Sequence, residues 1–283
     1  MEAFTNEANV LNETKEFTFN PAYPLLLVDW SYFCFHRFFS SFRWYKMQKE
    51  NMALDPAGLH EDEVFVTAFK KHFHDNFKKI LKQFRTVEGN IILLKDAPRA
   101  TLWRMGLYPE YKGTRDKVRA KTPSRNINSN FFTIAEQEAE KRGFRFLGRP
   151  TLEADDLAYM VCDQEPTIAI SLLSNDNDWI QIQQKHPHIV LQNMEGKNII
   201  ERGVKLVEKV IAGDCSDGIM PIFKKCGPKR CQVLAADPLA LEQALIDNPS
   251  SRAALELNRL LIDMANIPSW AQTCMVLKPI VIV

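Results

Sequence analysis

The chain lacks several features that mark other classes of protein. It has no apolar run long enough to span a bilayer, and residues 1–20 are polar and acidic instead of basic and then apolar. Its six cysteines form no Cys-x-x-Cys pair, and the sequence contains no internal repeat or low-complexity segment. We therefore expect reduced thiols, no membrane partner, and a reducing compartment (cytoplasmic or nuclear) with no secretion.

Basic residues are missing from one long acidic stretch. Between Pro150 and Gln184 there are seven Asp or Glu residues and no Lys or Arg. Carboxylates spaced this closely repel one another, and a polyvalent cation is a simple way to hold them in one fold. The net charge is only +1, and eight basic residues stand against two acidic ones between Arg99 and Arg125. A basic segment upstream of an acidic one suits an enzyme that binds metal ions and a polyanion.

Length and hydrophobic pattern predict an α/β fold. With 283 residues and 46% hydrophobic content the chain can bury a substantial core. Short apolar runs alternate with segments of helical spacing, which predicts a mostly parallel sheet flanked by helices. Strands are expected at residues 25–29, 90–94, 144–147 and 167–173, with helices over 30–45, 61–85 and from residue 152. We expect a flexible arm over residues 1–22, a core over 23–202, a smaller helical part over 203–283, and a late strand or packed tail at 279–283.

Acidic residues follow the expected strands. Asp29, Asp96, Asp176 and Asp178 each come at or just after the end of an apolar run. Glu153, Asp155 and Asp156 open an expected helix, where the helix dipole favours negative charge. Since ligands gather at the carboxyl ends of parallel strands, we expect these acids to share one rim. A carboxylate set without nearby His or Cys favours Mg²⁺ or Mn²⁺ over Zn²⁺. Two such ions, roughly 4 Å apart, are the usual arrangement for phosphodiester hydrolysis.

Five motifs occur in a fixed order between about residues 25 and 230. The strand-end Asp29 comes first, and Asp96 is followed by Trp103-Arg104 and Pro109–Arg115. Then come E-A-D-D at 153–156, S-N-D-N-D-W at 174–179 and G-D-C-S-D at 213–217. The ordered set resembles the 5′-nuclease superfamily: flap endonucleases, the 5′-exonuclease domain of bacterial DNA polymerase I, and phage 5′ nucleases such as the T-even phage ribonuclease H. The implied fold is a PIN-like core with a helical arch and a C-terminal helix–three-turn–helix.

The resemblance implies a role for each acidic residue and for two basic ones. In the family one set of carboxylates surrounds a first metal ion, a second set serves a second ion, and further acids orient bound waters. A Lys and an Arg reach the scissile phosphate and stabilise charge in the transition state. Carried over, these are Asp29, Asp96, Glu153 and Asp155 for the first ion, Asp176, Asp178 and Asp217 for the second, Asp156 and Asp214 for waters, and Lys112 and Arg104 for the phosphate.

The resemblance also implies two DNA-binding segments. Residues 107–126 match the arch under which the 5′ strand passes, with Arg99, Arg115 and Lys117 as contacts to DNA. Residues 213–231 match the helix–three-turn–helix, whose hairpin grips the duplex backbone through Gly227. Lys225 stands where the family has its first hairpin glycine, and the stretch before Gly227 is one residue longer than usual, which argues against a K⁺ ion there. The basic residues of this hairpin are Lys224, Lys225, Lys229 and Arg230.

The function implied is that of a structure-specific, Mg²⁺-dependent 5′ nuclease. It would act as a monomer, as a flap endonuclease or 5′→3′ exonuclease, on DNA with a 5′ flap, 5′ overhang or nick, in primer removal or repair. RNA/DNA primer hybrids remain a second candidate substrate. One alternative is a PIN-type ribonuclease, which usually lacks the arch and the helix–three-turn–helix. The other is a catalytically inactive DNA-junction binding protein, whose sign would be a lost acid; none is missing.

Overall fold

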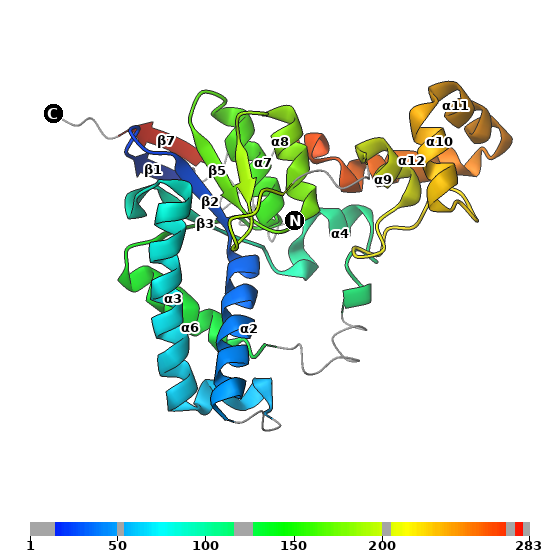
Figure 1. Ribbon diagram of the computed structural model, residues 1–283. Coiled ribbons are helices and arrows are strands. Elements are labelled where there is room, and N and C mark those ends of the chain that lie inside the picture. Colours follow the sequence, from blue (N-terminus) through cyan, green and yellow to red (C-terminus); the bar gives the residue numbers. More distant parts are fainter. Residues whose placement is uncertain (1–14, 50–53, 116–126, 200–204, 270–274, 280–283) are drawn as a thin grey trace, which may run out of the picture. The chain divides into compact units, whose positions relative to one another are not determined.

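The computed structural model describes residues 15–49, 54–115, 127–199, 205–269 and 275–279. Two compact units make up the chain (Figure 1). The first comprises residues 1–97, 119–199 and 273–283, and the second comprises residues 98–118 and 200–272. The beginning of the expected arch thus groups with the C-terminal helical part, whereas the sequence had placed the whole arch in the core. Within the described ranges no helix is both long and apolar enough to cross a membrane.

A five-stranded parallel sheet forms the centre of the first unit (Figure 1). Its order is β4-β3-β2-β5-β6, and every neighbouring pair is parallel. This confirms the predicted α/β class with a parallel sheet flanked by helices. Strand β6 was not anticipated because its three residues are too few to show a periodic pattern. The strands are β2 (Leu25–Asp29), β3 (Ile91–Lys95), β4 (Arg145–Gly148), β5 (Ile170–Leu173) and β6 (Val190–Gln192).

Helices cover both faces of this sheet (Figure 1). One face packs against α2 (Trp30–Gln48), α3 (Glu63–Phe84) and α6 (Asn130–Lys141). The other packs against α7 (Ala154–Gln164), with α8 (Ile180–Lys185) beside it. Because successive side chains of a strand point to opposite faces, each strand supplies both cores. Short 3-10 helices connect these elements at Pro56–Glu61 (η1), Glu88–Asn90 (η2) and Asn177–Trp179 (η5).

An aromatic row on α3 anchors α2 and the sheet. Phe65, Phe69, Phe73 and Phe77 recur every four residues, so they share one helix face, and each is at most 1% exposed. Phe73 meets Phe33 of α2 edge to face, with ring centroids 5.3 Å apart. Burial of each such side chain contributes about 1.5–3 kcal/mol. The row fixes α2, whose first residue directly follows Asp29.

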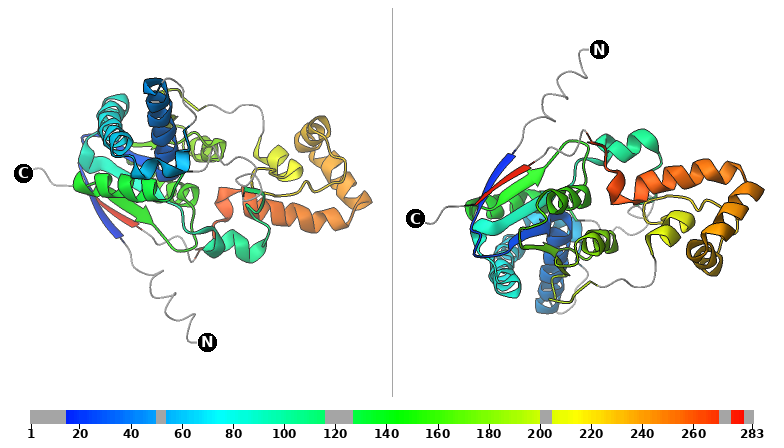
Figure 2. Two further views of the ribbon diagram at one scale, coloured as in Figure 1. Left: turned by 90° about the horizontal axis from the view of Figure 1, so that it is seen from below. Right: turned by 90° about the horizontal axis from the view of Figure 1, so that it is seen from above.

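A small second sheet joins the two ends of the described chain (Figure 2). Strand β1 (Lys15–Phe19) pairs in parallel with β7 (Met275–Pro279). Residues 15–19 lie within the segment expected to be a flexible arm, and the structure differs there because Phe17 and Phe19 are buried, whereas the other three residues of the strand are exposed. The side chain of Arg145 also donates a hydrogen bond to the Thr18 carbonyl at 2.6 Å. Of the expected late strand at 279–283, Pro279 belongs to β7, and residues 280–283 lie outside the described ranges.

The described residues of the second unit form helices and connecting turns. Side chains of the helix at Ser250–Ile262 bond to the segment from Val210 to Ile222. Asn258 donates to the carbonyls of Val210 and Met220 at 3.0 and 2.8 Å. Ser251 donates to the Ile222 carbonyl at 2.7 Å. The unit contains η3 (Arg99–Thr101), α4 (Trp103–Leu107), α9 (Leu206–Ala212), α10 (Pro228–Ala236), α11 (Pro238–Asp247), α12 (Ser250–Ile262) and η6 (Met264–Asn266).

Candidate metal centre and nucleic-acid interface

Asp29 ends β2 and caps α2. Its carboxylate accepts a hydrogen bond from the Tyr32 backbone N–H at 2.9 Å, which satisfies one of the free donors at the start of that helix. The Ser174 hydroxyl, just past β5, donates to the other oxygen at 2.9 Å. Neighbouring strands β2 and β5 therefore present Asp29 and Ser174 to each other at their carboxyl ends.

Asp96 joins two helix starts. It directly follows β3, and its carboxylate accepts from the Ser31 hydroxyl at 2.7 Å. The other oxygen accepts from the Ala154 backbone N–H at 2.9 Å. Ser31 lies in the first turn of α2 and Ala154 begins α7. Asp96 therefore connects the rim near Asp29 to the acidic segment at the start of α7.

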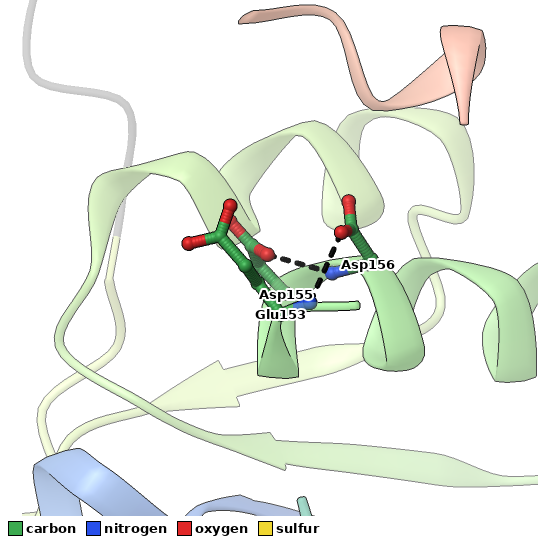
Figure 3. Close-up of side chains that lie close together, drawn as sticks. All are labelled: Glu153, Asp155 and Asp156. Atoms are coloured by element: carbon green, nitrogen blue, oxygen red, sulfur yellow. Dashed lines mark hydrogen bonds between the residues drawn. The ribbon is translucent and has the colours of Figure 1, made fainter. Parts of the chain in front are cut away.

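Three acids gather at the start of α7 (Figure 3). Carboxylate oxygens of Glu153, Asp155 and Asp156 all lie within 4.8 Å of one another. The Asp156 carboxylate is fully buried and accepts from the Glu153 backbone N–H at 3.1 Å, as in a capping box. Asp155 is half-buried and accepts from the Asp156 backbone N–H at 2.7 Å. Asp156 thus shapes the helix start, while Asp155 is the member more open to a ligand.

Burial and nearby acidic residues both act on the carboxyl group of Asp29. Burial raises the pKa of Asp29 to about 7, and repulsion from Asp96 and Asp176 adds to the effect, against the opposing hydrogen bonds from Tyr32 and Ser174. Burial is the largest cause, and the smaller contributions of Asp96 and Asp176 show that other carboxylates lie close enough to repel the charge on Asp29. A hard divalent cation would relieve this repulsion and is matched by oxygen ligands. The residues present therefore fit Mg²⁺ or Mn²⁺.

Asp176 and Asp178 belong to the same rim through Ser174. The Asp176 backbone N–H donates to the Ser174 hydroxyl at 3.1 Å, and the Asp178 N–H donates to the Asp176 carboxylate at 2.9 Å. Sequence reasoning gave no role to Ser174 or Ser31, although both hold predicted ligands in place. The available signal was position, because each serine lies within two residues of a strand end.

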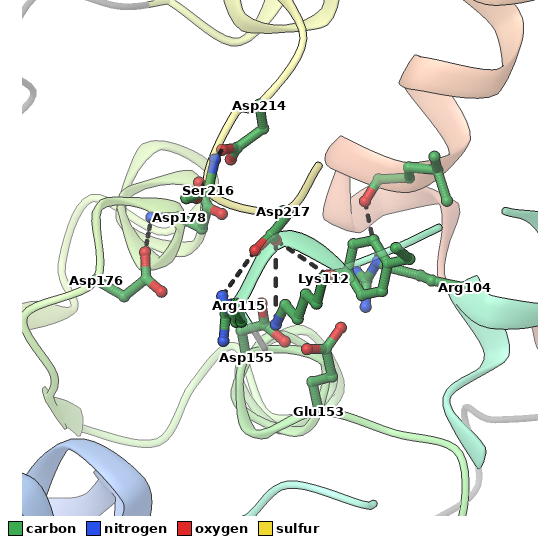
Figure 4. Close-up of polar contacts among 12 residues, drawn as sticks. Arg104, Lys112, Arg115, Glu153, Asp155, Asp176, Asp178, Asp214, Ser216 and Asp217 are labelled. Carbon is green, nitrogen blue, oxygen red and sulfur yellow. Dashed lines mark hydrogen bonds and ion pairs between the residues drawn. The ribbon is translucent and has the colours of Figure 1, made fainter. Parts of the chain in front are cut away.

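Asp217 lies in the second unit among basic and aromatic residues (Figure 4). Its carboxylate is 2.7 Å from the Arg115 guanidinium and 4.0 Å from the Lys112 ammonium. The Tyr111 hydroxyl donates to it at 3.2 Å, and its carbonyl accepts from the Lys112 N–H at 2.7 Å. Lys112 has φ 56°, a left-handed conformation. Asp217 thus holds the first part of the expected arch.

Asp214 is similarly held within the second unit. Lys209 pairs with it at 2.8 Å, and Ser216 donates to it from both its N–H and its hydroxyl at 2.8 and 2.6 Å. Although burial opposes the charged form, the contacts with Lys209 and Ser216 lower the pKa of Asp214. Asp214 and Asp217 belong to one unit and Asp176 and Asp178 to the other. The grouping of Asp217 with Asp176 and Asp178 around one ion stays a prediction.

Arg104 is buried, whereas a side chain that contacts a DNA phosphate is expected to be exposed. It is 2% exposed, its guanidinium lies 4.5 Å from the Trp103 ring, and its Nε donates to the Leu261 carbonyl at 2.9 Å (Figure 4). These contacts join α4 to the end of α12. Arg99 likewise donates to the Tyr111 carbonyl at 2.7 Å. Direct contact of either arginine with DNA stays a prediction, and Lys117 lies outside the described residues.

The expected hairpin presents an exposed basic turn that comprises the residues just before α10 and the first turn of that helix. The side chains of Lys224, Lys225, Lys229 and Arg230 are all exposed. Gly227 caps α10 with an ordinary φ of −74°, and a Cβ built there would meet no described atom within 4 Å. The fold of this unit therefore does not require glycine at 227. A close approach by a ligand backbone would explain it.

Residues 24–210 match the family described as 5′-3′ exonuclease, N-terminal resolvase-like domain. The chain belongs to this family. Its membership agrees with the 5′-nuclease resemblance of the ordered motifs. No curated protein sequence matches the chain.

Solved structures of bacteriophage T5 proteins share the fold. The T5 5′-exonuclease with bound zinc has a TM-score of 0.60 at 21% identity, over 85% of this chain and 89% of that one. A T5 flap endonuclease in a pseudo-enzyme-product complex with DNA and metal ions has a TM-score of 0.59 at 20% identity, over the same 85% and 89%. A T5 protein co-crystallised with metal ions gives 0.58 at 19% identity, again over 85% and 89%.

Proposed function

We propose that this protein is a structure-specific 5′ nuclease that hydrolyses phosphodiesters near the junction of single-stranded and duplex DNA. Membership in the 5′-3′ exonuclease family supports a 5′ nuclease. The observation that carries the proposal is the linked carboxylate rim: Asp29 and Asp176 meet through Ser174, and Asp96 is bonded to the first residue of α7. Such a rim at the carboxyl ends of parallel strands is where this architecture binds its ligands.

The rim would hold the divalent cations, which we take to be two Mg²⁺ or Mn²⁺ ions. Asp29, Asp96, Glu153 and Asp155 would hold the first, while Asp176 and Asp178 would contribute to the second together with Asp217. When bound, such ions supply electrostatic stabilisation of the attacking and leaving oxygens. Asp156 and Asp214 already have partners in the protein and would orient waters.

Basic residues of the second unit would bind the phosphates of the DNA. Lys112 and Arg115 lie in the expected arch and pair with Asp217. On substrate binding they would turn toward the phosphate, where a fixed positive charge stabilises the transition state. The basic turn from Lys224 to Arg230 would hold the duplex backbone, and its contacts would be weakened by salt. The likeness to a T5 flap endonuclease whose structure contains DNA and metal ions is compatible with these roles.

Cleavage of a labelled 5′-flap oligonucleotide tests the proposal. Mg²⁺ or Mn²⁺ should support cutting near the junction, and chelation should abolish it. Asp155→Asn should eliminate cleavage while duplex binding persists. The matched control is Asp163→Asn on the same helix: Asp163 pairs with Lys185 at 2.5 Å and is not among the predicted ligands. That variant should cut within about twofold of wild type.

The same assay separates the alternatives. A PIN-type ribonuclease would cut single-stranded RNA without needing a junction. A catalytically inactive junction-binding protein would shift the flap substrate in a gel and leave it uncut at every metal concentration. Either result would overturn the proposed function.

A further inference from the structure

Two cysteines occupy adjoining positions at the start of α10. Gly227 is the N-cap of this helix and Pro228 its first residue. Cys226 therefore precedes the cap by one residue, and Cys231 is the fourth residue of the helix. Side chains at these two positions meet in the hydrophobic-staple arrangement. The Cys231 N–H donates to the Gly227 carbonyl at 3.1 Å, which confirms the helical turn between them.

The two sulfur atoms are in contact. Their Sγ atoms are 3.1 Å apart, and the Cys231 Sγ also lies 3.6 Å from the Cys226 carbonyl oxygen. A disulfide bond requires about 2.05 Å between the sulfurs, so a shift of roughly 1 Å would join them. Among the five described cysteines this is the one pair in contact; Cys34 and Cys162 are buried elsewhere and Cys215 is exposed.

We propose that Cys226 and Cys231 are a reversible redox site, which a small-molecule disulfide converts to an intramolecular disulfide across the first turn of α10. Cys226 is half-buried and Cys231 is 1% exposed. An external oxidant therefore reaches Cys226 first. Cys231 is the resolving thiol, because its sulfur already contacts that of Cys226.

The exchange proceeds in two steps. The Cys226 thiolate attacks one sulfur of the small-molecule disulfide, forming a mixed disulfide and releasing one small thiolate. The Cys231 thiol then gives up its proton as its sulfur attacks Cys226, forming the protein disulfide and releasing the second small thiolate. Two protein thiols are oxidised and one small disulfide is reduced to two small thiols.

The environment of Cys231 suits the second role. Burial raises the pKa of the Cys231 thiol to about 12, with further contributions from Cys226 and Glu208 against the opposing charge of Arg230. A buried thiol of this kind is a poor first nucleophile. Once the mixed disulfide has formed, the attack by Cys231 is intramolecular, and this proximity offsets its low fraction of thiolate.

The position of the pair connects it to DNA. Lys224 and Lys225 precede Cys226, and Lys229 and Arg230 lie between the cysteines; all four are exposed. Resting on the proposed function, duplex bound across this basic turn would cover Cys226. We therefore expect DNA to shield the site from oxidation, and the disulfide to fix the turn that carries these charges.

The first experiment tests the disulfide and does not depend on DNA. The full chain is incubated with oxidised glutathione, free thiols are alkylated, and the protein is digested with trypsin without reduction. Trypsin cuts after Lys225, Lys229 and Arg230, so the cysteines fall in separate peptides that stay joined only through a disulfide. The expected product is the linked pair with the mass of two hydrogens lost, reversed by a dithiol.

The variants define what would overturn the proposal. Cys231→Ser should stop at a glutathione adduct on Cys226, Cys226→Ser should leave Cys231 unmodified, and Cys215→Ser should still form the link. A persistent glutathione adduct on wild-type Cys226 without linked peptide contradicts the proposal, as does linkage through Cys215.

The second experiment repeats the oxidation with excess duplex DNA. Linkage should slow at least about fivefold, since phosphate contacts supply most of the affinity. Lys225→Ala combined with Arg230→Ala should remove the protection, and this variant keeps the tryptic sites after Lys224 and Lys229 that separate the two cysteines. If the disulfide forms at the same rate with saturating DNA, DNA does not shield the cysteines and that part of the proposal is wrong. The disulfide itself would still stand on the first experiment. Failure of flap cleavage would instead contradict the proposed function and leave the first experiment unaffected.

Discussion

The carboxylate of Asp96 accepts a hydrogen bond from the backbone N–H of Ala154 at 2.9 Å. This bond ties the end of β3 to the first residue of α7, between Glu153 and Asp155. Two segments of the predicted metal site, 58 positions apart in the chain, are thereby held by a single side chain. The single carboxylate of Asp96 is therefore both a structural hydrogen-bond acceptor and a predicted metal ligand.

Replacement of Asp96 should separate these two roles. Asp96→Asn keeps an oxygen acceptor for Ala154 but removes the charge, so we expect flap cleavage to fall by about 10²–10³-fold with little change in stability. Asp96→Ala should lose cleavage similarly and also lower the free energy of unfolding by about 1 kcal/mol, because the Ala154 N–H loses its partner. Urea unfolding and single-turnover cleavage measure the two effects. If the two variants are equally stable, the bond from Ala154 to Asp96 does not contribute to stability.

The raised pKa of Asp29 predicts an unusual pH dependence of stability. The native, metal-free protein binds this proton more tightly than the unfolded chain, since the pKa is raised from 3.8 to about 7. The stabilisation is present at low pH and is lost as the pH rises from about 4 through about 7. Asp29→Asn keeps the cap of α2 and removes the titration. In chelator, its stability relative to wild type should rise by on the order of 2 kcal/mol between about pH 5 and about pH 8.

Mg²⁺ provides the check on that assignment. Added ion should restore the stability of the wild-type protein near neutral pH and should do little for Asp29→Asn, because a ligand that binds only the native state stabilises it. If the difference in free energy of unfolding between wild type and Asp29→Asn does not change with pH in chelator, Asp29 does not titrate in this range.

Much of this rim was predictable from the sequence, because its acids sit at the ends of apolar runs. Leu25–Asp29 and Ile170–Leu173 are short buried strands, and their ends set where Asp29 and Asp176 fall. The hydrogen bonds of Ser31 and Ser174 were not predictable, since they depend on the register between β2 and its neighbours. Nor was the burial of Arg104, because its partner, the Leu261 carbonyl, is 157 positions away.

Gly227 offers a test of the nucleic-acid interface that leaves the fold intact. Gly227→Ala should be nearly neutral for stability, because φ is −74° and a Cβ would meet no described atom within 4 Å. It should weaken duplex binding by about fivefold to tenfold, which corresponds to about 1–1.4 kcal/mol, if phosphate approaches the backbone there. Gly213→Ala is the contrasting control: φ is 72° and its Cβ would come within 2.4 Å of the Ile219 carbonyl oxygen, so it should unfold the turn. Unchanged DNA affinity in Gly227→Ala would count against contact at this turn.

Arg104 and Lys112 should give opposite results when each is changed to alanine. Arg104→Ala removes a buried guanidinium that stacks on Trp103 and leaves the Leu261 carbonyl without its donor, so it should lower the free energy of unfolding by about 2–3 kcal/mol. Lys112→Ala should leave stability within about 1 kcal/mol and lower the rate of the cleavage step by about 10²-fold. Thermal melting beside single-turnover kinetics distinguishes them. A Lys112→Ala enzyme with a normal cleavage step would remove Lys112 from the chemistry.

The pairing of β1 with β7 has a consequence for the order in which the protein folds. Phe17 of β1 lies opposite Leu277 of β7, so the first described strand to be synthesised finds its partner only when the last one emerges. The five-stranded sheet needs no residue beyond Gln192 and can form earlier. Contacts between such distant segments form slowly. During synthesis Phe17 and Phe19 would therefore stay without their strand partner longer than any other part of the first unit, and a ribosome-stalled chain ending before residue 275 should show β1 cut readily by protease.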